Sequence, residues 1–376
     1  MKIGIDAFWY FDGYSSLQRV TYNFVNSLLQ NDFENEYVLF FDARFKGRKP
    51  NVESHKKLSI KYLRTGSLRY NLFLKIFLLP FYSYLEKTDV FITQYYPSPF
   101  SRGKRISFVY DILFESYPGL FTKRERYQLW PQKVFTRMSN YIITISESEK
   151  NRLLEFRYSR SAESILVYSL APDEKFKPQC FFPDERLKKL KGKYNLPNEF
   201  LLYVGLMSGR KNLDNLLRAL PLLNIAIPLV ITGEKHPAYP SNHVRIIKEL
   251  GIENRVLFTG FVEDAELPII YSLSKIFCFP SLAEGFGLPP LEALAAQVPI
   301  AVSHRTSLPE IGGECAVYFD PEKPKEIAEA LNKLIDDPVF YAQKKAMTLL
   351  QASKFSWDKS AIALISQFNI IKKQQT

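Results

Sequence analysis

Short apolar runs alternate along the chain with segments whose apolar residues recur at helical spacing. The apolar runs have the length and the Val, Ile, Phe and Tyr content of buried strands. They predict strands at 2–8, 37–42, 58–63, 89–96, 105–111, 141–146, 165–170, 199–205, 227–233, 255–261, 275–281, 299–303 and 316–320. The helical pattern predicts helices at 17–29, 126–139, 213–220, 244–250, 266–273, 290–297, 324–335 and 357–373. Pro131 is expected to kink the second of these helices.

Strand–helix alternation of this kind indicates α/β domains in which helices cover both faces of a parallel sheet. Because the alternation occurs in two series, we expect two doubly wound, Rossmann-like domains. The first spans 1–175 and the second 199–354, with a polar, Lys-rich linker at 176–198. The last helix, at 355–376, is expected to pack back on the first domain. Ligands of such sheets bind at the carboxyl ends of the strands, which predicts a site in the cleft between the domains.

The stretch AEGFGLPPLEAL, 283–294, places two carboxylates, Glu284 and Glu292, around a turn that contains two glycines. The turn follows a buried strand, and Pro289 and Pro290 suit the first positions of a helix. A strand, a glycine loop and a helix N-terminus together present backbone N–H groups and a positive dipole end to an anion. Residues of this stretch are therefore candidates for binding a phosphate-bearing ligand.

A second candidate stretch is YVGLMSGRKNLDNLL, 203–217. A strand ends at Gly205, and two cations, Arg210 and Lys211, follow just before a helix. An Arg can hold phosphate oxygens bidentately and a Lys adds a point charge, so the pair suits a diphosphate. Taken alone, however, an Arg–Lys pair is more often merely solvated. Gly233, at the end of another predicted strand, adds a further turn.

The chain carries a formal net charge of +11. Its three cysteines are too few to form a disulfide framework. Because the N-terminus lacks a signal-peptide pattern, we expect a cytoplasmic protein. No nucleic-acid-binding signature accompanies the charge, so no nucleic-acid partner is expected. An anionic membrane, a phosphorylated substrate and a solvated basic surface stay open as explanations. The apolar stretch 70–87 is too short to span a bilayer, and it either lies in a membrane interface or forms a buried helix.

Metal chemistry finds no support in the sequence. The chain has no Asp-x-Asp sequence, and its four histidines have no metal-ligand spacing, so no metal or other cofactor is expected. His304, in AVSHRTSLPE, is a candidate for touching the ligand, although a solvated loop histidine is the commoner case. Ser307 and Glu310, in the same loop, are expected to cap its short helix.

Taken in order and with their spacing, these motifs resemble the retaining glycosyltransferases of family four, also described as glycosyl transferases group 1. Over 200–322 the resemblance rests on YVG, RKN, TGF, FPSLAEGFGLPPLEALAAQVPIAVS and TSLPEIGGECAVYFDP. It extends more loosely to KIGIDA, LLPFYSYLEKTDVFIT and NYIITISESEKNRL in the first half. The resemblance implies the GT-B fold and a donor that is a UDP- or GDP-linked sugar. The relatives that it suggests are bacterial polysaccharide and lipopolysaccharide mannosyl- or glucosyltransferases.

The resemblance also implies a role for each matching position. Arg210 and Lys211 would neutralise the donor diphosphate and Glu284 would lie beside the donor sugar, so these three are the candidate catalytic residues. Glu292 would accept hydrogen bonds from the ribose hydroxyls. The other donor-binding candidates are Gly205, Asn212, Gly233, Gly285, Phe286, Gly287 and Leu288.

Two stretches depart from the family pattern. In FDGYSSLQRVTY, 11–22, Gly13 and Arg19 match the family pattern. Gln18 and Val20 stand where relatives often have a second glycine and a tyrosine. Tyr110 and Asp111 stand where many members have His-Asp. These four residues, Gly13, Arg19, Tyr110 and Asp111, are candidates for the donor and acceptor side of the cleft.

The expected function is that of a retaining, metal-independent glycosyltransferase in surface polysaccharide synthesis. It would move a hexose to a glycan or lipid-linked acceptor, in the cytoplasm or peripherally at the inner face of the cell membrane. Two alternatives stay open. One is a nucleotide-sugar epimerase or phosphorylase on a similar fold, against which stands the absence of a catalytic histidine pair or a pyridoxal lysine signature. The other is a non-catalytic partner subunit of a transferase complex, which the two altered stretches keep open.

Overall fold

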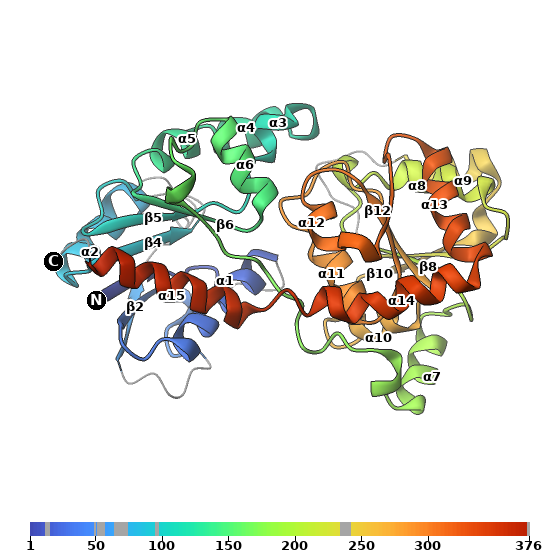
Figure 1. Cartoon of the computed structure of the whole chain (residues 1–376), viewed down its shortest axis with the longest axis horizontal. Coiled ribbons are helices and arrows are strands. Elements are labelled where there is room, and N and C mark those ends of the chain that lie inside the picture. The colour runs from blue at the N-terminus through green and yellow to red at the C-terminus, as the bar shows by residue number, and fades with distance from the viewer. Residues whose placement is uncertain are drawn as a thin grey trace. The chain divides into compact units, whose positions relative to one another are not determined.

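The computed structural model describes residues 1–11, 16–48, 50, 57–63, 74–94, 98–233 and 242–373. The chain divides into two units (Figure 1): the first comprises Met1–Leu170 and Ser356–Thr376, and the second Ala171–Phe355. Each unit is built around one parallel sheet. The prediction of two Rossmann-like α/β domains is thereby confirmed.

The first unit holds a 7-stranded parallel sheet in the order β3-β2-β1-β4-β5-β6-β7. The strands are β1 (Lys2–Asp6), β2 (Glu36–Asp42), β3 (Leu58–Leu63), β4 (Val90–Gln94), β5 (Lys104–Phe108), β6 (Tyr141–Thr144) and β7 (Ile165–Val167). Each lies within or overlaps a predicted apolar run. The order reverses between β1 and β4, and such a switch point is where doubly wound sheets bind ligands at the carboxyl ends of their strands.

The helices of the first unit are α1 (Ser16–Asn31), α2 (Leu79–Leu85), α3 (Leu113–Ser116), α4 (Lys123–Leu129), α5 (Pro131–Thr136), α6 (Glu147–Glu155) and α15 (Trp357–Lys373). The single kinked helix expected at 126–139 is thus divided into α4 and α5. Pro131 opens α5, because its ring and its missing N–H prevent it from continuing the hydrogen bonding of α4.

The last helix, α15, packs on α1 within the first unit. Asn31 donates to the Asp358 carboxylate at 2.7 Å, and the Ser360 hydroxyl donates to the Ser169 carbonyl oxygen at 2.8 Å. Phe368 and Ile371 are buried. Apolar burial on one face and polar contacts at the helix start together hold this distant segment to the first sheet.

The apolar stretch 70–87 lies partly outside the described residues, because these resume at 74. From there a π-helical turn, Leu74–Leu78, leads into α2. One face of α2 is buried through Leu79, Pro80 and Ser83. By contrast, Phe77 in the preceding turn and Phe81, Tyr84 and Leu85 in α2 are each more than half exposed. The buried-helix alternative therefore holds for one face only. Among the described residues, no helix is long and apolar enough to cross a membrane.

The second unit holds a 6-stranded parallel sheet in the order β10-β9-β8-β11-β12-β13. Its strands are β8 (Leu201–Val204), β9 (Leu229–Thr232), β10 (Val256–Gly260), β11 (Ile276–Phe279), β12 (Ile300–Ser303) and β13 (Val317–Phe319). Its helices are α7 (Asp184–Lys193), α8 (Leu213–Ala219), α9 (His243–Leu250), α10 (Leu267–Leu273), α11 (Leu288–Ala295), α12 (Leu308–Gly312), α13 (Pro324–Asp336) and α14 (Pro338–Ala352). Residues 176–198, expected as a linker, carry α7 and belong to this unit. The order reverses between β8 and β11, the strands that precede the two candidate stretches.

Candidate active site

The loops of the candidate donor site begin where β8 and β9 end, at Gly205 and Gly233. The φ angle of Gly233 is 132°, in the left-handed region that favours glycine. A Cβ built on Gly233 would lie 2.3 Å from the carbonyl oxygen of Gly205, a distance that no real side chain tolerates. Glycine at position 233 therefore lets the ends of the two strands approach each other, and this brings their loops together.

Arg210 and Lys211 lie in one 3-10 turn, Gly209–Lys211, after β8. Both cations reach Glu284, which lies 73 residues beyond Lys211 in the chain. Arg210 Nη1 is 3.0 Å from Glu284 Oε2, and Lys211 Nζ is 2.8 Å from Glu284 Oε1. The Ser281 hydroxyl also donates to this carboxylate. The structure thus brings together the three residues predicted to be catalytic.

The charges of this cluster keep Glu284 ionised. Burial by itself would raise the pKa of its carboxyl group, but the neighbouring Arg210 and Lys211 lower that pKa to about 2. Burial lowers the pKa of the Lys211 ammonium, which lies 4.6 Å from the centroid of the Phe279 ring. Among the described residues, the ion pairs of Glu284 join two cations to one carboxylate, so the cluster would attract an anion such as a diphosphate.

The turn between β11 and α11 holds four of the donor-binding candidates: Gly285, Phe286, Gly287 and Leu288. Gly287 caps the N-terminus of α11 with a φ of 118°, and a Cβ there would lie 3.0 Å from Leu308 Cδ2. The side chain of Phe286 is buried against the Phe355 ring, with the ring centroids 5.8 Å apart. The backbone of the turn, rather than the Phe286 side chain, is therefore the part that can approach a ligand.

Ser307 supports this turn from the neighbouring loop. Its hydroxyl donates to the carbonyl oxygens of Glu284 and Phe286. The helix that follows Ser307, α12, receives no hydrogen bond from the Ser307 side chain. The expectation that the Ser307 side chain caps this helix is therefore wrong, because its hydroxyl donates to the turn before α11 instead. Thr306 contributes as well, since its hydroxyl accepts from the Glu284 N–H at 2.9 Å.

Glu292 lies inside α11 and only 3% of it is exposed. Its Oε2 accepts a hydrogen bond from the Tyr271 hydroxyl at 3.0 Å. Tyr271, on α10, is itself fully buried, and its ring packs edge-on against Phe176 with the centroids 5.4 Å apart. Tyr271 thus orients the carboxylate that was predicted to bind ribose. The sequence offered no sign of this role, because Tyr271 appears there only as one apolar position of a helix.

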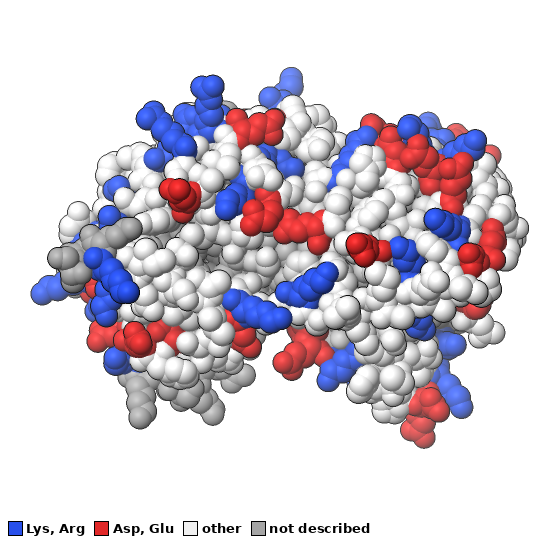
Figure 2. Space-filling model, viewed as in Figure 1, with Lys and Arg blue, Asp and Glu red and all other residues white. Residues whose placement is uncertain are grey.

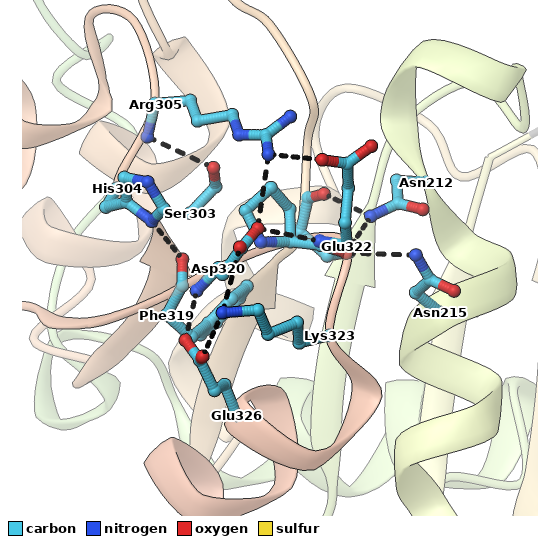
Figure 3. Close-up of polar contacts among 12 residues, drawn as sticks. Asn212, Asn215, Ser303, His304, Arg305, Phe319, Asp320, Glu322, Lys323 and Glu326 are labelled. Carbon is cyan, nitrogen blue, oxygen red and sulfur yellow. Dashed lines mark hydrogen bonds and ion pairs between the residues drawn. The ribbon is translucent and has the colours of Figure 1, made fainter.

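Asn212 joins two loops of the second unit (Figure 3). It adopts a left-handed conformation, and its amide nitrogen donates to the carbonyl oxygens of Pro280 at 2.9 Å and Pro321 at 2.6 Å. Asn215 donates to the same Pro321 oxygen at 3.0 Å. The amide nitrogen of Asn212, a predicted donor-binding residue, is therefore already engaged by the protein, and the residue positions the Arg210–Lys211 turn.

The Pro321 loop is in turn anchored by charged side chains that follow β12 and β13 (Figure 3). Arg305 pairs with Asp320 at 3.2 Å and also with Glu322. Lys323 pairs with Glu326 at 2.8 Å. His304, a candidate for touching the ligand, has its Nδ1 2.9 Å from the Phe319 carbonyl oxygen. These contacts stabilise the loop on which Asn212 depends.

The candidates of the first unit have a different character. Gly13 lies outside the described residues, and Arg19 is half-buried on α1. Tyr110 is buried, its hydroxyl donates to Gln94 Oε1 at 2.6 Å, and burial raises its pKa. Asp111 is half-buried and accepts from the Leu113 N–H at 3.3 Å. The hydroxyl of Tyr110 is thus engaged inside the unit.

Among the described residues, no group of three or more His, Cys, Asp or Glu side chains could hold a metal ion. The polar groups that the structure gathers at the ends of the second sheet's strands are instead cations, a carboxylate and backbone turns.

Known proteins resemble this chain in sequence and in fold. The model of the family "Glycosyl transferases group 1" matches residues 185–374. The chain is 35% identical over 232 residues to the serotype-specific mannosyltransferase WbdA of Escherichia coli, a match that covers 60% of this chain and 28% of WbdA. It is 30% identical over 236 residues to the O-antigen chain mannosyltransferase B of Escherichia coli, covering 61% of this chain and 60% of that protein. The chain therefore spans less than two thirds of the length of these relatives.

Two solved structures share the fold at low sequence identity. Sucrose-phosphate synthase from Thermosynechococcus elongatus is 17% identical, with a TM-score of 0.76 over the whole of both chains. Anabaena HepE in complex with UDP and glucose is 18% identical, with a TM-score of 0.74 over 98% of this chain and 99% of that chain. The arrangement of two parallel-sheet units thus matches the GT-B fold, as predicted.

Proposed function

Because the chain belongs to the family of glycosyl transferases group 1, we propose that it transfers a hexose from a nucleotide diphosphate sugar to a glycan or lipid-linked acceptor. The observation that carries the proposal is the cluster of Arg210, Lys211 and Glu284 at the strand ends of the second sheet. The names of the mannosyltransferase relatives favour a role in surface polysaccharide synthesis. The UDP complex of a protein with the same fold is consistent with a nucleotide-linked donor.

The leaving group would be the nucleoside diphosphate, which gains negative charge as the bond to the sugar breaks. Arg210 and Lys211 would take up this charge, because they are held in place before the donor arrives. The Gly285–Gly287 backbone and the N-terminus of α11 would add N–H groups and the helix dipole. Glu284 would shift from its two cations towards the donor sugar, and Glu292, oriented by Tyr271, would accept from the ribose hydroxyls.

We propose further that the reaction is metal-independent and retains the configuration of the sugar. The excess of positive charge at Arg210 and Lys211 supports diphosphate binding without a divalent cation. The acceptor proton would pass to the departing phosphate on the face from which the acceptor attacks. Nuclear magnetic resonance of the first product formed would reveal an inverted anomer if retention is wrong.

A thermal-shift screen of UDP, GDP and their hexose derivatives tests donor binding. A ligand at about 100 times its dissociation constant should stabilise the protein by ~2.7 kcal/mol. The ligand that raises the melting temperature is then tested for slow hydrolysis of its sugar, with and without EDTA. Absence of hydrolysis with every donor would favour a non-catalytic subunit. Loss of activity in EDTA, restored by manganese or magnesium, would contradict the metal-free reaction.

We also propose that the protein works at the cytoplasmic face of a membrane, with peripheral contact through α2. The support is its exposed apolar face, where Phe77 and Phe81 are each 57% exposed and Tyr84 is 61% exposed. Such a face suits the interfacial layer of a bilayer. Replacement of Phe77 and Phe81 by serine should lower co-sedimentation with vesicles severalfold. Equal sedimentation of wild type and variant would remove α2 from the contact.

A further inference from the structure

A hollow of about 930 Å³ lies in the first unit, and none of the residues proposed to act on the donor lines it. It is bordered by the end of α5, the start of β6, the end of α6 and the loop that leads to β7. Its polar wall consists of hydroxyl, amide and guanidinium side chains, those of Thr136, Arg137, Ser139, Asn140, Ser159, Arg160, Ser164 and Arg157. The hollow thus lies near the amino ends of β6 and β7, whereas the Tyr110–Asp111 loop follows the carboxyl end of β5.

The charges that border this hollow have one sign. Arg137, Arg157 and Arg160 line it, and no carboxylate is found among its described lining residues. None of the three arginines forms an ion pair with any residue in the described ranges. This differs from the Arg210–Lys211 cluster, where a carboxylate compensates part of the charge. Three uncompensated guanidinium groups around one hollow suit a ligand that brings negative charge.

Three further observations concern the wall of the hollow. The Nε of Arg137 donates to the Arg157 carbonyl oxygen at 2.7 Å, so the two elements that supply these arginines are tied together. Arg157 holds a left-handed backbone conformation with a φ of 57°, which is unfavourable for a residue with a side chain. Thr136 is fully buried at the wall of the hollow, and its hydroxyl has no hydrogen-bond partner in the described part of the chain.

The surroundings extend the same positive field. A second hollow, of about 800 Å³, shares Arg137 and is lined by Lys123, Arg126 and Lys133 together with the rings of Tyr127 and Trp130. Its lining includes one carboxylate, Glu115, which lies 3.7 Å from Lys133 Nζ, so cations still outnumber carboxylates there. In Figure 2, Lys and Arg side chains gather over α4 and α5 along this edge of the first unit. Tyr127 is 76% exposed and Trp130 57% exposed. The field would raise the local concentration of anions near the three arginines.

We propose that the hollow formed by Arg137, Arg157 and Arg160 binds a phosphate-bearing group. The planar guanidinium groups can each hold two phosphate oxygens. Its volume accommodates a group larger than inorganic phosphate, such as a phosphorylated sugar or a lipid headgroup. The site does not depend on the proposed transfer reaction, because none of its residues belongs to the donor cluster.

Isothermal titration with inorganic pyrophosphate tests the site on the full chain. The double variant R157Q/R160Q removes two exposed arginines, and K188Q/K189Q, on the exposed face of α7, removes the same charge elsewhere. All proteins keep the donor cluster, so any binding at that cluster is common to them and cancels in the comparison. We expect R157Q/R160Q to weaken binding roughly tenfold or more, and K188Q/K189Q less than twofold. R157K/R160K, which keeps the charge but loses the bidentate geometry, should lie between them.

Co-sedimentation with vesicles distinguishes the two sources of phosphate. The probes are phosphatidylglycerol–phosphatidylcholine vesicles and pure phosphatidylcholine vesicles. A lipid headgroup as ligand predicts more sedimentation with the anionic vesicles than with pure phosphatidylcholine vesicles, and R157Q/R160Q or added pyrophosphate should remove this difference. A free phosphorylated ligand predicts the calorimetric effect, with equal sedimentation of the parent protein and R157Q/R160Q on both kinds of vesicle. The proposal is overturned if R157Q/R160Q and K188Q/K189Q behave alike with both probes, provided that their melting temperatures match the parent protein.

Discussion

Glu284 in the second unit and Glu149 in the first are both buried carboxylates that lie beside an arginine, but the charge around them differs. Glu284 has two cations as partners, and they lower its pKa to about 2 against the effect of burial. Glu149 is fully buried with Arg152 and accepts from the Ile112 N–H at 2.6 Å. Burial, together with the nearby Asp111, raises its pKa to about 8.

The comparison separates a cluster suited to an incoming charge from one that holds a loop in place. Around Glu284 the cations outnumber the carboxylates, so an anionic ligand can replace the internal partner without leaving bare positive charge. Around Glu149 the hydrogen bond to Ile112 fixes the loop that carries Tyr110 and Asp111, and no excess of cations faces a ligand. A buried charged residue thus indicates chemistry only when its neighbours leave charge uncompensated.

The largest expected effect is that of Lys211→Ala. It removes a cation that would stabilise the leaving diphosphate, so kcat for donor hydrolysis or transfer should fall about 10²- to 10³-fold. The donor KM should change much less, because the charge matters most in the transition state. Steady-state kinetics measure both values, and Lys188→Ala on α7 is the control for a lost surface charge. A normal kcat for Lys211→Ala would refute the phosphate role.

The second-largest expected effect concerns Glu292, on α11, and the donor KM. Glu292→Ala should raise the donor KM roughly 10- to 150-fold and nearly keep kcat, because a hydrogen bond to a charged group contributes ~1.5–3 kcal/mol in both ground and transition states. Tyr271→Phe removes only the orienting hydroxyl and should raise KM by roughly two- to tenfold. An unchanged KM in both variants, at unchanged melting temperature, would leave Glu292 as a merely structural acid.

Glu149→Gln tests the first-unit side of the comparison through stability. The raised pKa means that the folded state binds a proton more tightly than the unfolded state does. Protonated Glu149 therefore stabilises the folded protein. This contribution is complete below the unfolded pKa of about 4.5 and is lost as pH rises through about 8. Glutamine can still accept from Ile112, so the variant should lack this pH-dependent loss, which is roughly 2–5 kcal/mol. Denaturant titrations at several pH values from pH 5 to pH 8 measure the free energy of unfolding of both proteins. An equal change of this free energy with pH in wild type and variant would contradict the assignment.

Tyr110→Phe should have the smallest effect. The Thr21 hydroxyl still donates to Gln94 Oε1 at 2.6 Å, so the loss should be about 0.5–1.5 kcal/mol of unfolding free energy. We expect kcat and both substrate KM values to stay within about threefold, because the hydroxyl is engaged inside the first unit. A loss of kcat as large as that of Lys211→Ala would mean that Tyr110 acts on a substrate and would break the contrast between the two units.

The strands and the α/β class followed from the sequence, because strand periodicity depends on neighbouring residues, whereas the helices α6, α7 and α14 were not among those predicted. The apolar runs matched all the strands that the structure describes, and the Gly285–Gly287 turn before α11 was evident from its glycines and prolines. The chain order of motifs also sufficed to indicate the family. Pro131 showed the limit of this approach, since whether it kinks or divides a helix depends on the packing of its two sides.

Contacts between residues far apart in the chain required the tertiary structure. Strand order places β8 next to β11, and this brings Arg210 and Lys211 to Glu284. The same folding engages the Asn212 amide with two backbone carbonyls and places Tyr271 on Glu292. The sequence determined which chemical groups are present and on which kind of element. Which group compensates another depends on distances across the sheet, because electrostatic and hydrogen-bond energies change steeply within a few ångströms.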